Sequence, residues 1–188
     1  MKAILLTISI CLAGIAYAQR PNGLSATGEQ DHAHILKVSL LSPFVGTLNV
    51  HYEKRLDENS SFQLEAFYFS GQIFNQQSDV RGGGLTANYR FYLTKQFPAG
   101  WFVQPFLRYQ QYWPLPSVRL RNDINIQVGG AGIVFGYQLV AANRISFDAF
   151  AGPVYSRLFV NNQSVGNKYL PVFNGGWLRL GVTLGFLF

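Results

Sequence analysis

Two kinds of side chain alternate along the segment from Trp177 to Phe188. Its even-numbered positions are all apolar, whereas its odd-numbered positions include Arg179, Thr183 and two glycines. Successive side chains of an extended strand point to opposite faces of a sheet, so this period of two creates one fully apolar face. A helix of 3.6 residues per turn would mix the two sets on every face. The segment therefore predicts a β-strand with one side turned away from water.

The same alternation recurs along most of the chain. In one segment, for example, Leu48, Val50 and Tyr52 alternate with polar side chains. Turn-forming residues separate the segments, and no segment of helical period lies between them. We expect eight antiparallel strands that form an all-β, up-and-down barrel, at residues 35–42, 46–56, 61–70, 81–93, 101–113, 124–140, 145–159 and 174–188.

The segment at residues 124–140 changes phase. Ile126 and Val128 fall on one face, whereas Ile133 falls on the other. A β-bulge at Gly129–Gly130, which lies at the switch, would return both sets to one side of the sheet. The segment is also uncharged, but its four glycines and its amide side chains make it a poor membrane helix. We therefore expect a bulged strand.

The connections between the predicted strands alternate in length. Those at 57–60, 94–100 and 141–144 are short, whereas those at 71–80, 114–123 and 160–173 are longer and polar. Outer-membrane barrels have short periplasmic turns and longer external loops. Eight strands would also place both ends of the barrel on the side of the short turns. The first external loop, at residues 42–45, is very short for this pattern.

Composition bears on what surrounds the barrel. Charged residues make up 13% of the 188 residues, against about 25% in average soluble domains. Aromatic residues are abundant, and Trp101 and Trp113 bracket one predicted strand on its apolar face, which is typical of the aromatic girdles of membrane barrels. These features favour a transmembrane β-barrel in the outer membrane. A soluble, lipocalin-like ligand-binding barrel, with its apolar face turned inward, is the alternative.

The first residues have the features of an export signal. Lys2 precedes an apolar stretch that ends at Ala16-Tyr17-Ala18, a pattern that signal peptidase recognises. We expect residues 1–18 to be a signal peptide cleaved before Gln19, since the apolar stretch is too short for a membrane anchor. Residues 19–34 are expected to form a flexible lead-in, and residues 35–188 the barrel. Cys11, the one cysteine, lies within the predicted signal, so no disulfide or cysteine–metal site is expected after cleavage.

The polar faces of the predicted strands carry charges that a barrel would bury. An eight-stranded barrel has an interior just wide enough for side chains to fill it, and buried charges need partners. Pairing from the turns predicts that Glu53 lies near Glu65, and that Glu65 lies opposite Arg90. The two carboxylates could act as an acid–base pair, but an ionic plug is favoured. Besides Lys37 and His51, the expected lumenal charge network comprises Glu53, Arg55, Glu65, Arg90, Arg108, Asp148 and Arg179.

Signals for catalysis or for a bound cofactor are weak. His51, Ser39 and Glu53 could be drawn as a triad like those of lipid-modifying barrels, but no motif spacing supports it. His32 and His34 lack further metal ligands. The glycine clusters at 82–84 and 130–136 lack the spacing of phosphate or dinucleotide loops. We expect no enzyme activity, metal or cofactor, and a lipid-modifying enzyme remains the alternative.

The net charge of +6 is scattered along the chain rather than clustered, which argues against a nucleic-acid partner. Several arginines fall in the longer loops. Arg119 and Arg121 could contact lipopolysaccharide phosphates through charge-assisted hydrogen bonds, although a solvated loop explains them equally simply.

The whole chain after residue 18 resembles the small eight-stranded outer-membrane barrels of the OmpX and OmpA-transmembrane kind. More narrowly, it is similar to an uncharacterised family of Bacteroidota outer-membrane barrels in the motifs Lys37–Pro43, Val50–Arg55, Tyr89–Leu93 and Pro98–Val103. This resemblance implies a monomer in outer-membrane lipid. Phe186 and the final Phe188 resemble the signal read by the barrel-assembly machinery, although Thr183 stands where that signal usually has glycine. We expect a structural or surface-interaction role carried by the external loops.

Overall fold

The computed structural model describes residues 33–72, 79–94, 97–114, 126–142, 144–160 and 174–188. The predicted signal peptide and most of the predicted lead-in lie outside the described residues, as do Arg119 and Arg121.

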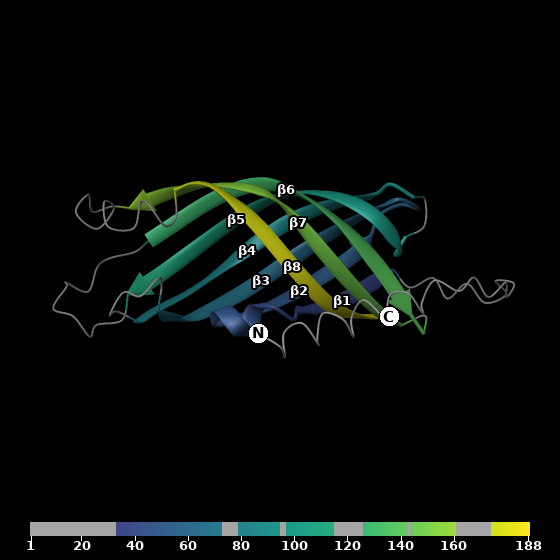
Figure 1. Ribbon diagram of the computed structural model, residues 1–188, viewed down its shortest axis with the longest axis horizontal. Coiled ribbons are helices and arrows are strands. Elements are labelled where there is room, and N and C mark those ends of the chain that lie inside the picture. Colours follow the sequence, from purple (N-terminus) through teal and green to yellow (C-terminus); the bar gives the residue numbers. More distant parts are fainter. Residues whose placement is uncertain (1–32, 73–78, 95–96, 115–125, 143, 161–173) are drawn as a thin grey trace, which may run out of the picture. The chain divides into compact units, whose positions relative to one another are not determined.

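Eight strands form one closed barrel in which each strand is hydrogen-bonded to the next along the chain (Figure 1). A short 3-10 helix, η1, lies between the first two strands. Among the described residues, no helix is long and apolar enough to cross a membrane. The elements are β1 (His34–Ser39), η1 (Ser42–Val45), β2 (Thr47–Arg55), β3 (Ser60–Gln72), β4 (Asp79–Tyr92), β5 (Gly100–Pro114), β6 (Ile126–Ala141), β7 (Ile145–Val160) and β8 (Gly175–Leu187).

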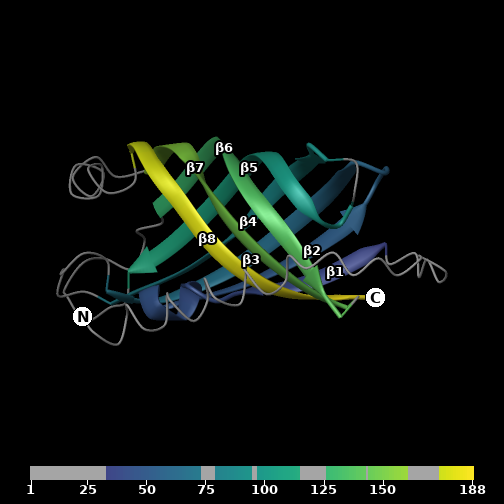
Figure 2. The same cartoon turned by 45° about the vertical axis from the view of Figure 1, so that its right-hand side comes forward.

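All neighbouring strands are antiparallel, so the predicted all-β, up-and-down topology is confirmed. The barrel closes between β1 and β8, where Ile35 lies opposite Leu187 and Ser39 lies opposite Thr183. Figure 2 shows the strongly tilted β8 ribbon, in yellow, meeting β1 near the end marked C. The tilt follows from the closure, because strands can close into a barrel only when they lean relative to its axis.

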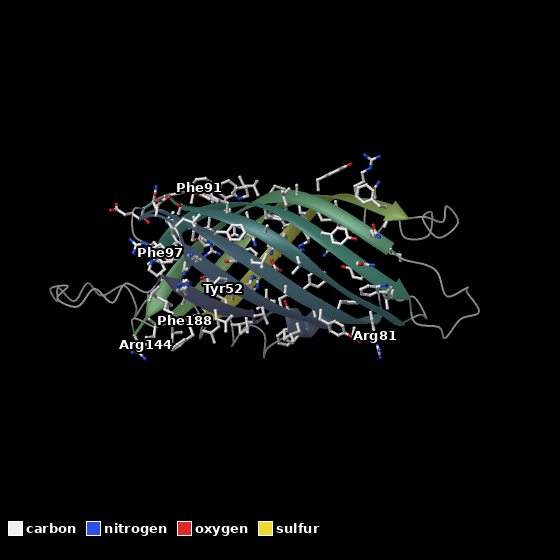
Figure 3. The ribbon with its side chains drawn as sticks, turned by 180° about the vertical axis from the view of Figure 1, so that it is seen from behind. Tyr52, Arg81, Phe91, Phe97, Arg144 and Phe188 are labelled. Atoms are coloured by element: carbon white, nitrogen blue, oxygen red, sulfur yellow. The ribbon has the colours of Figure 1, made fainter. Side chains whose placement is uncertain are left out.

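The period of two places apolar and polar side chains on opposite sides of the wall. Leu107 and Leu178, which face outward, are 68% and 67% exposed, and Leu48, Leu85 and Phe135 are also exposed. The residues that alternate with them point into the barrel and are mostly buried. Phe91 and Phe188 are among the labelled outward side chains in Figure 3.

The predicted bulge in β6 is wrong. The pairing of β6 with β5 keeps one register from Tyr112–Ile126 through Tyr109–Gly129 and Arg108–Gly130 to Gly100–Gln138. Ile126 and Val128 simply point inward, where they pack with Val80 and Tyr112 in a buried apolar cluster. The change of phase in the sequence therefore marks a place where the barrel interior itself is apolar.

Aromatic side chains fill another part of the interior, and glycines make room for them. Phe150 packs with Phe102 and Phe106 in a second buried cluster. A Cβ atom added at Gly181 or at Gly136 would overlap the side chain of Phe150. These glycines are needed because an eight-stranded barrel leaves little space beyond its own side chains.

The two ends of the barrel differ. At one end the chain turns tightly between β2 and β3, where the Ser60 hydroxyl donates a hydrogen bond of 2.8 Å to the Asp57 carboxylate. At the other end, η1 forms the short first loop and is closed by Gly46, whose positive φ of 70° suits glycine. Most residues of the longer connections predicted at 71–80, 114–123 and 160–173 lie outside the described residues.

Candidate functional site

Four charged side chains from four strands meet inside the barrel and form the balanced cluster: Lys37, Glu53, Arg90 and Asp148. The Lys37 ammonium lies 2.5 Å from Glu53 Oε2 and 2.6 Å from Asp148 Oδ2. Arg90 Nη1 lies 2.9 Å from Asp148 Oδ2 and 3.4 Å from Glu53 Oε2. All four side chains are almost completely buried. Two positive and two negative charges thus neutralise one another where water is excluded.

Neutral side chains add hydrogen bonds to the balanced cluster. Arg90 donates from Nε to Gln104 Oε1 at 2.7 Å and from Nη2 to Gln63 Oε1 at 3.1 Å. Tyr92 donates its hydroxyl proton to Glu53 at 2.8 Å. The Arg90 guanidinium also stacks over the Phe102 ring at 3.8 Å. Such hydrogen bonds help to offset the desolvation of a buried ion pair. Among the described residues, Asp148 Oδ1 and Gln138 Nε2 are buried without a partner.

A second group, the arginine-rich cluster, comprises Glu65, Arg108 and Arg179. Arg108 Nη2 lies 3.1 Å from Glu65 Oε1, and Arg179 Nη2 forms an ion pair with Glu65 Oε2. Glu65 is fully buried, and Asn49 donates an amide hydrogen bond to it at 3.2 Å. Unlike the balanced cluster, this one brings two guanidinium groups to a single carboxylate.

Aromatic rings hold the two guanidinium groups of the arginine-rich cluster. Arg179 lies 4.5 Å from the centre of the Phe106 ring, and Arg108 lies 5.9 Å from the same ring. Cation–π contacts of this kind stabilise a desolvated guanidinium group. The rings therefore fix both arginines without neutralising their charge.

Six of the seven charges of the expected network fall into these two clusters, and two predicted pairings are wrong. Glu53 lies opposite Gln63 and Glu65 lies opposite His51, so the two carboxylates belong to different clusters. Arg90 lies opposite Ser61 rather than Glu65. The positions of the turns in the sequence indicate which strands are neighbours. They do not determine which residues of two neighbouring strands lie opposite each other.

Arg55, at the end of β2, contacts the turn that follows this strand. Its Nε donates a hydrogen bond of 3.2 Å to the Asp57 carbonyl, and its guanidinium group lies 5.6 Å from the centre of the Phe97 ring. The predicted network therefore included one arginine that serves the turn between β2 and β3.

Sequence reasoning overlooked the glutamines as members of the site. Gln138 Oε1 accepts hydrogen bonds from Lys37, at 3.1 Å, and from Arg90, and it lies 2.9 Å from the Tyr92 hydroxyl oxygen. Their position in the sequence could have identified them, because Gln63, Gln104 and Gln138 alternate with outward-facing residues and so point into the barrel. A long amide in that phase of a narrow barrel can reach the buried charges.

Two of the residues that could be drawn as a triad, His51 and Glu53, have other partners. His51 Nδ1 is hydrogen-bonded to the Gln63 amide nitrogen at 3.0 Å and lies 3.8 Å from Glu65. Glu53 is instead bound by Lys37, Tyr92 and Ser61. Within the described part of the chain, no group of three or more metal-ligating His, Cys, Asp or Glu side chains occurs.

The aromatic residues singled out from the sequence lie on the outer surface. Trp101 and Trp113 are exposed near the two ends of β5, and Trp101 packs edge-on against Tyr137 with a centroid distance of 5.0 Å. Phe186 and Phe188 are also exposed. The Phe188 ring stacks on His34 at 5.8 Å, beside the closure of the barrel.

Comparisons with known proteins give a likeness of fold and a family. The chain is similar to the N-terminal β-barrel domain of OprF from Pseudomonas aeruginosa, with 11% sequence identity and a TM-score of 0.43, covering 84% of this chain and 98% of that chain. No curated protein matches the chain. Residues 6–172 match the model of a family described as "Protein of unknown function (DUF3575)", and the chain belongs to that family.

Proposed function

We propose that this chain is a monomeric β-barrel of the bacterial outer membrane with a structural or surface-interaction role. In this proposal the strands cross the lipid, the side chains inside form a closed polar plug, and the external loops carry any specificity. A Bacteroidota origin and recognition of Phe188 by the barrel-assembly machinery belong to the same proposal.

The outer face carries the proposal. Large apolar side chains such as Leu107, Leu178 and Leu180 are more than 60% exposed along the strands. Monomeric soluble proteins rarely expose apolar patches larger than a few hundred Å². A surface of this kind is stable where acyl chains rather than water surround it.

The inner face argues against the soluble alternative. A lipocalin-like barrel would hold an apolar ligand in an apolar interior. Here Lys37, Glu53, Arg90 and Asp148 are buried together in the interior, and hydrogen bonds link them to one another. Such a plug leaves neither a ligand cavity for an apolar molecule at that level nor a continuous aqueous channel.

Cell fractionation tests the proposed location. We expect the protein in the outer-membrane fraction, extracted only by detergent, and migrating faster on a gel when it is not heated than after boiling. Release into the periplasmic fraction without detergent would favour the soluble barrel and contradict the proposal.

The proposed surface role can be tested separately through the loop that contains Arg119 and Arg121. If these arginines contact lipopolysaccharide phosphates, added lipopolysaccharide will raise the unfolding temperature of the wild type more than that of an Arg119→Ala/Arg121→Ala variant. Equal increases in the unfolding temperature of the two proteins would show that this loop does not bind lipopolysaccharide. That result would not bear on the proposed outer-membrane location.

A further inference from the structure

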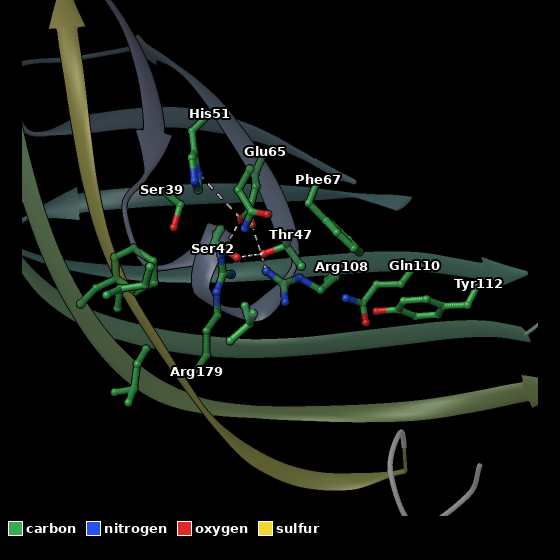
Figure 4. A pocket seen from close by; sticks show the side chains of 16 residues that line it. Ser39, Ser42, Thr47, His51, Glu65, Phe67, Arg108, Gln110, Tyr112 and Arg179 are labelled. Carbon is green, nitrogen blue, oxygen red and sulfur yellow. Dashed lines mark hydrogen bonds and ion pairs between the residues drawn. The ribbon is translucent and has the colours of Figure 1, made fainter. Parts of the chain in front are cut away.

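The arginine-rich cluster forms one wall of a pocket inside the barrel. The pocket has a volume of about 350 Å³ and lies beside η1, within the roughly 300–1,000 Å³ range of ligand sites. Figure 4 shows His51 and Arg179 approaching Glu65 from opposite sides, with Arg108 and Gln110 along the same wall. The pocket is therefore large enough for a small molecule and is lined by strong hydrogen-bonding groups.

The formal charge of this wall is not balanced. Arg108 and Arg179 contribute two positive charges, whereas Glu65 contributes one negative charge. The Arg179 side chain is 7% exposed and that of Glu65 is fully buried. An excess charge in such a place is costly unless another charge neutralises it. An anion in the pocket would restore the balance that Lys37, Glu53, Arg90 and Asp148 already have among themselves.

Buried polar atoms of the same wall point to the same conclusion. Among the described residues, three buried atoms of residues that line the pocket have no hydrogen-bond partner: the donors Arg179 Nη1 and His51 Nε2, and the acceptor Asn49 Oδ1. The Gln63 amide nitrogen donates to His51 Nδ1, so the proton of the neutral ring lies on Nε2, which is a donor. The two donors, beside an excess positive charge, suit an oxyanion, and the hydroxyl of a hydrogen phosphate could donate to Asn49 Oδ1.

The pocket lies beside the seam between β1 and β8, since residues of both strands line it. In the described residues, the ladder between β1 and β8 covers Thr183–Leu187 of β8 and is continued by one bond from the Leu40 N–H to the Val182 carbonyl. After Leu40 the chain does not continue as a strand but enters η1. Leu180, which faces outward and is 62% exposed, lines the pocket together with inward-facing Arg179. In the described residues, the ladder to β1 thus stops before the stretch of β8 that carries Arg179.

We infer that this pocket binds a phosphate group, with Arg179 and Arg108 as its cationic ligands and His51 Nε2 as a further donor. The phosphate group is the chemistry shared by a free phosphate ion and the headgroup of an anionic lipid that enters between η1 and β8. This site goes beyond the proposed outer-membrane role, because binding of free phosphate needs only the folded barrel.

Calorimetric titration of the full chain, folded in a non-ionic detergent, with inorganic phosphate at constant ionic strength tests the site. We expect saturable binding. Arg179→Gln should weaken it at least about tenfold, the effect of losing one charge-assisted hydrogen bond. Glu65→Gln should strengthen it, because that change removes the competing carboxylate and raises the positive excess. Arg144→Gln, an exposed arginine in the turn at the opposite end, is the matched control and should bind as the wild type does.

The opposite signs of the two pocket variants separate binding from damage to the fold, since general destabilisation would weaken both. A second titration with phosphatidic acid in the detergent micelles distinguishes the sources. If phosphatidic acid competes with inorganic phosphate, the site accepts a lipid headgroup. If inorganic phosphate binds and phosphatidic acid does not compete with it, the ligand is the free ion. Equal phosphate affinity in wild type, Arg179→Gln and Glu65→Gln, or the absence of saturable binding, would overturn the inference.

Discussion

Replacing Arg90 by leucine removes one of the two cations of the balanced cluster and retains much of its apolar volume. In the native barrel Arg90 contacts Asp148 at 2.9 Å and Glu53 at 3.4 Å and donates to Gln104 at 2.7 Å. Without it, two carboxylates share the single ammonium group of Lys37, and the buried cluster carries one net negative charge. The Gln104 and Gln63 carbonyl oxygens also lose a donor.

The magnitude follows from removing one partner of a buried ion pair, which costs about 3–5 kcal/mol. The middle of that range is appropriate, because Arg90 is fully buried. We therefore expect Arg90→Leu to lower the free energy of unfolding by about 4 kcal/mol.

Urea unfolding of the barrel folded in lipid vesicles, followed by tryptophan fluorescence, measures this loss. Arg144→Leu is the matched control, since Arg144 is an exposed arginine at the turn before β7 (Figure 3), and surface changes of this kind stay within about 0.5 kcal/mol. A loss for Arg90→Leu no larger than that of the control would refute the reasoning.

A rescue experiment separates charge from volume. Asp148→Asn in the Arg90→Leu background returns the cluster to Lys37 and Glu53 alone, which are balanced. We expect the double variant to be more stable than Arg90→Leu, with a coupling of at least about 1 kcal/mol. Additive losses would show that packing rather than charge balance dominates.

Three other predictions follow from the wall and the interior of the barrel. Leu107→Arg, in the middle of the outer face of β5, should lower the free energy of unfolding in vesicles by about 2–4 kcal/mol, whereas Leu93→Arg near the turn should cost at most about 1 kcal/mol; equal costs would contradict the proposed depths. Gly181→Ala should lower the free energy of unfolding by about 1–3 kcal/mol, because the added methyl group overlaps Phe150. The loss should be smaller in a Phe150→Leu background, and equal losses in the two backgrounds, measured by urea unfolding, would contradict this explanation. Planar-bilayer recordings should give no stable, large conductance because side chains fill an eight-stranded interior, and a large steady current would show that the plug is open.

Most of the fold could be predicted from the alternation of side chains, because apolar and polar residues had to separate across a single wall. The largest error in a strand boundary is at β1, predicted to end at residue 42 and found to end at Ser39, before η1. The bulge at Gly129–Gly130 was predicted because Ile126 and Val128 were assumed to face outward. Periodicity identifies which residues share a face, but it does not reveal that part of the interior is apolar.

The candidate site was less predictable. The phase of each strand identified which charges point inward, but pairs such as Arg90 with Asp148 depend on contacts across the barrel rather than between neighbours. A shift of two residues in one hairpin keeps every side chain on its face and changes every partner. For that reason Glu65 was assigned to Arg90, although Arg108 and Arg179 bind it.

The central claim, that the apolar outer face meets lipid, can be tested with a fluorescent label at a single introduced cysteine. Leu107 lies midway between Trp101 and Trp113 along β5 and points outward. We predict that a label on Leu107→Cys, in a chain without Cys11, is quenched by bromine atoms deep in the acyl chains and is protected from iodide in water. A label on Arg144→Cys should show the reverse. Quenching of the Leu107 label by iodide, with no response to brominated lipid, would contradict a membrane-spanning barrel.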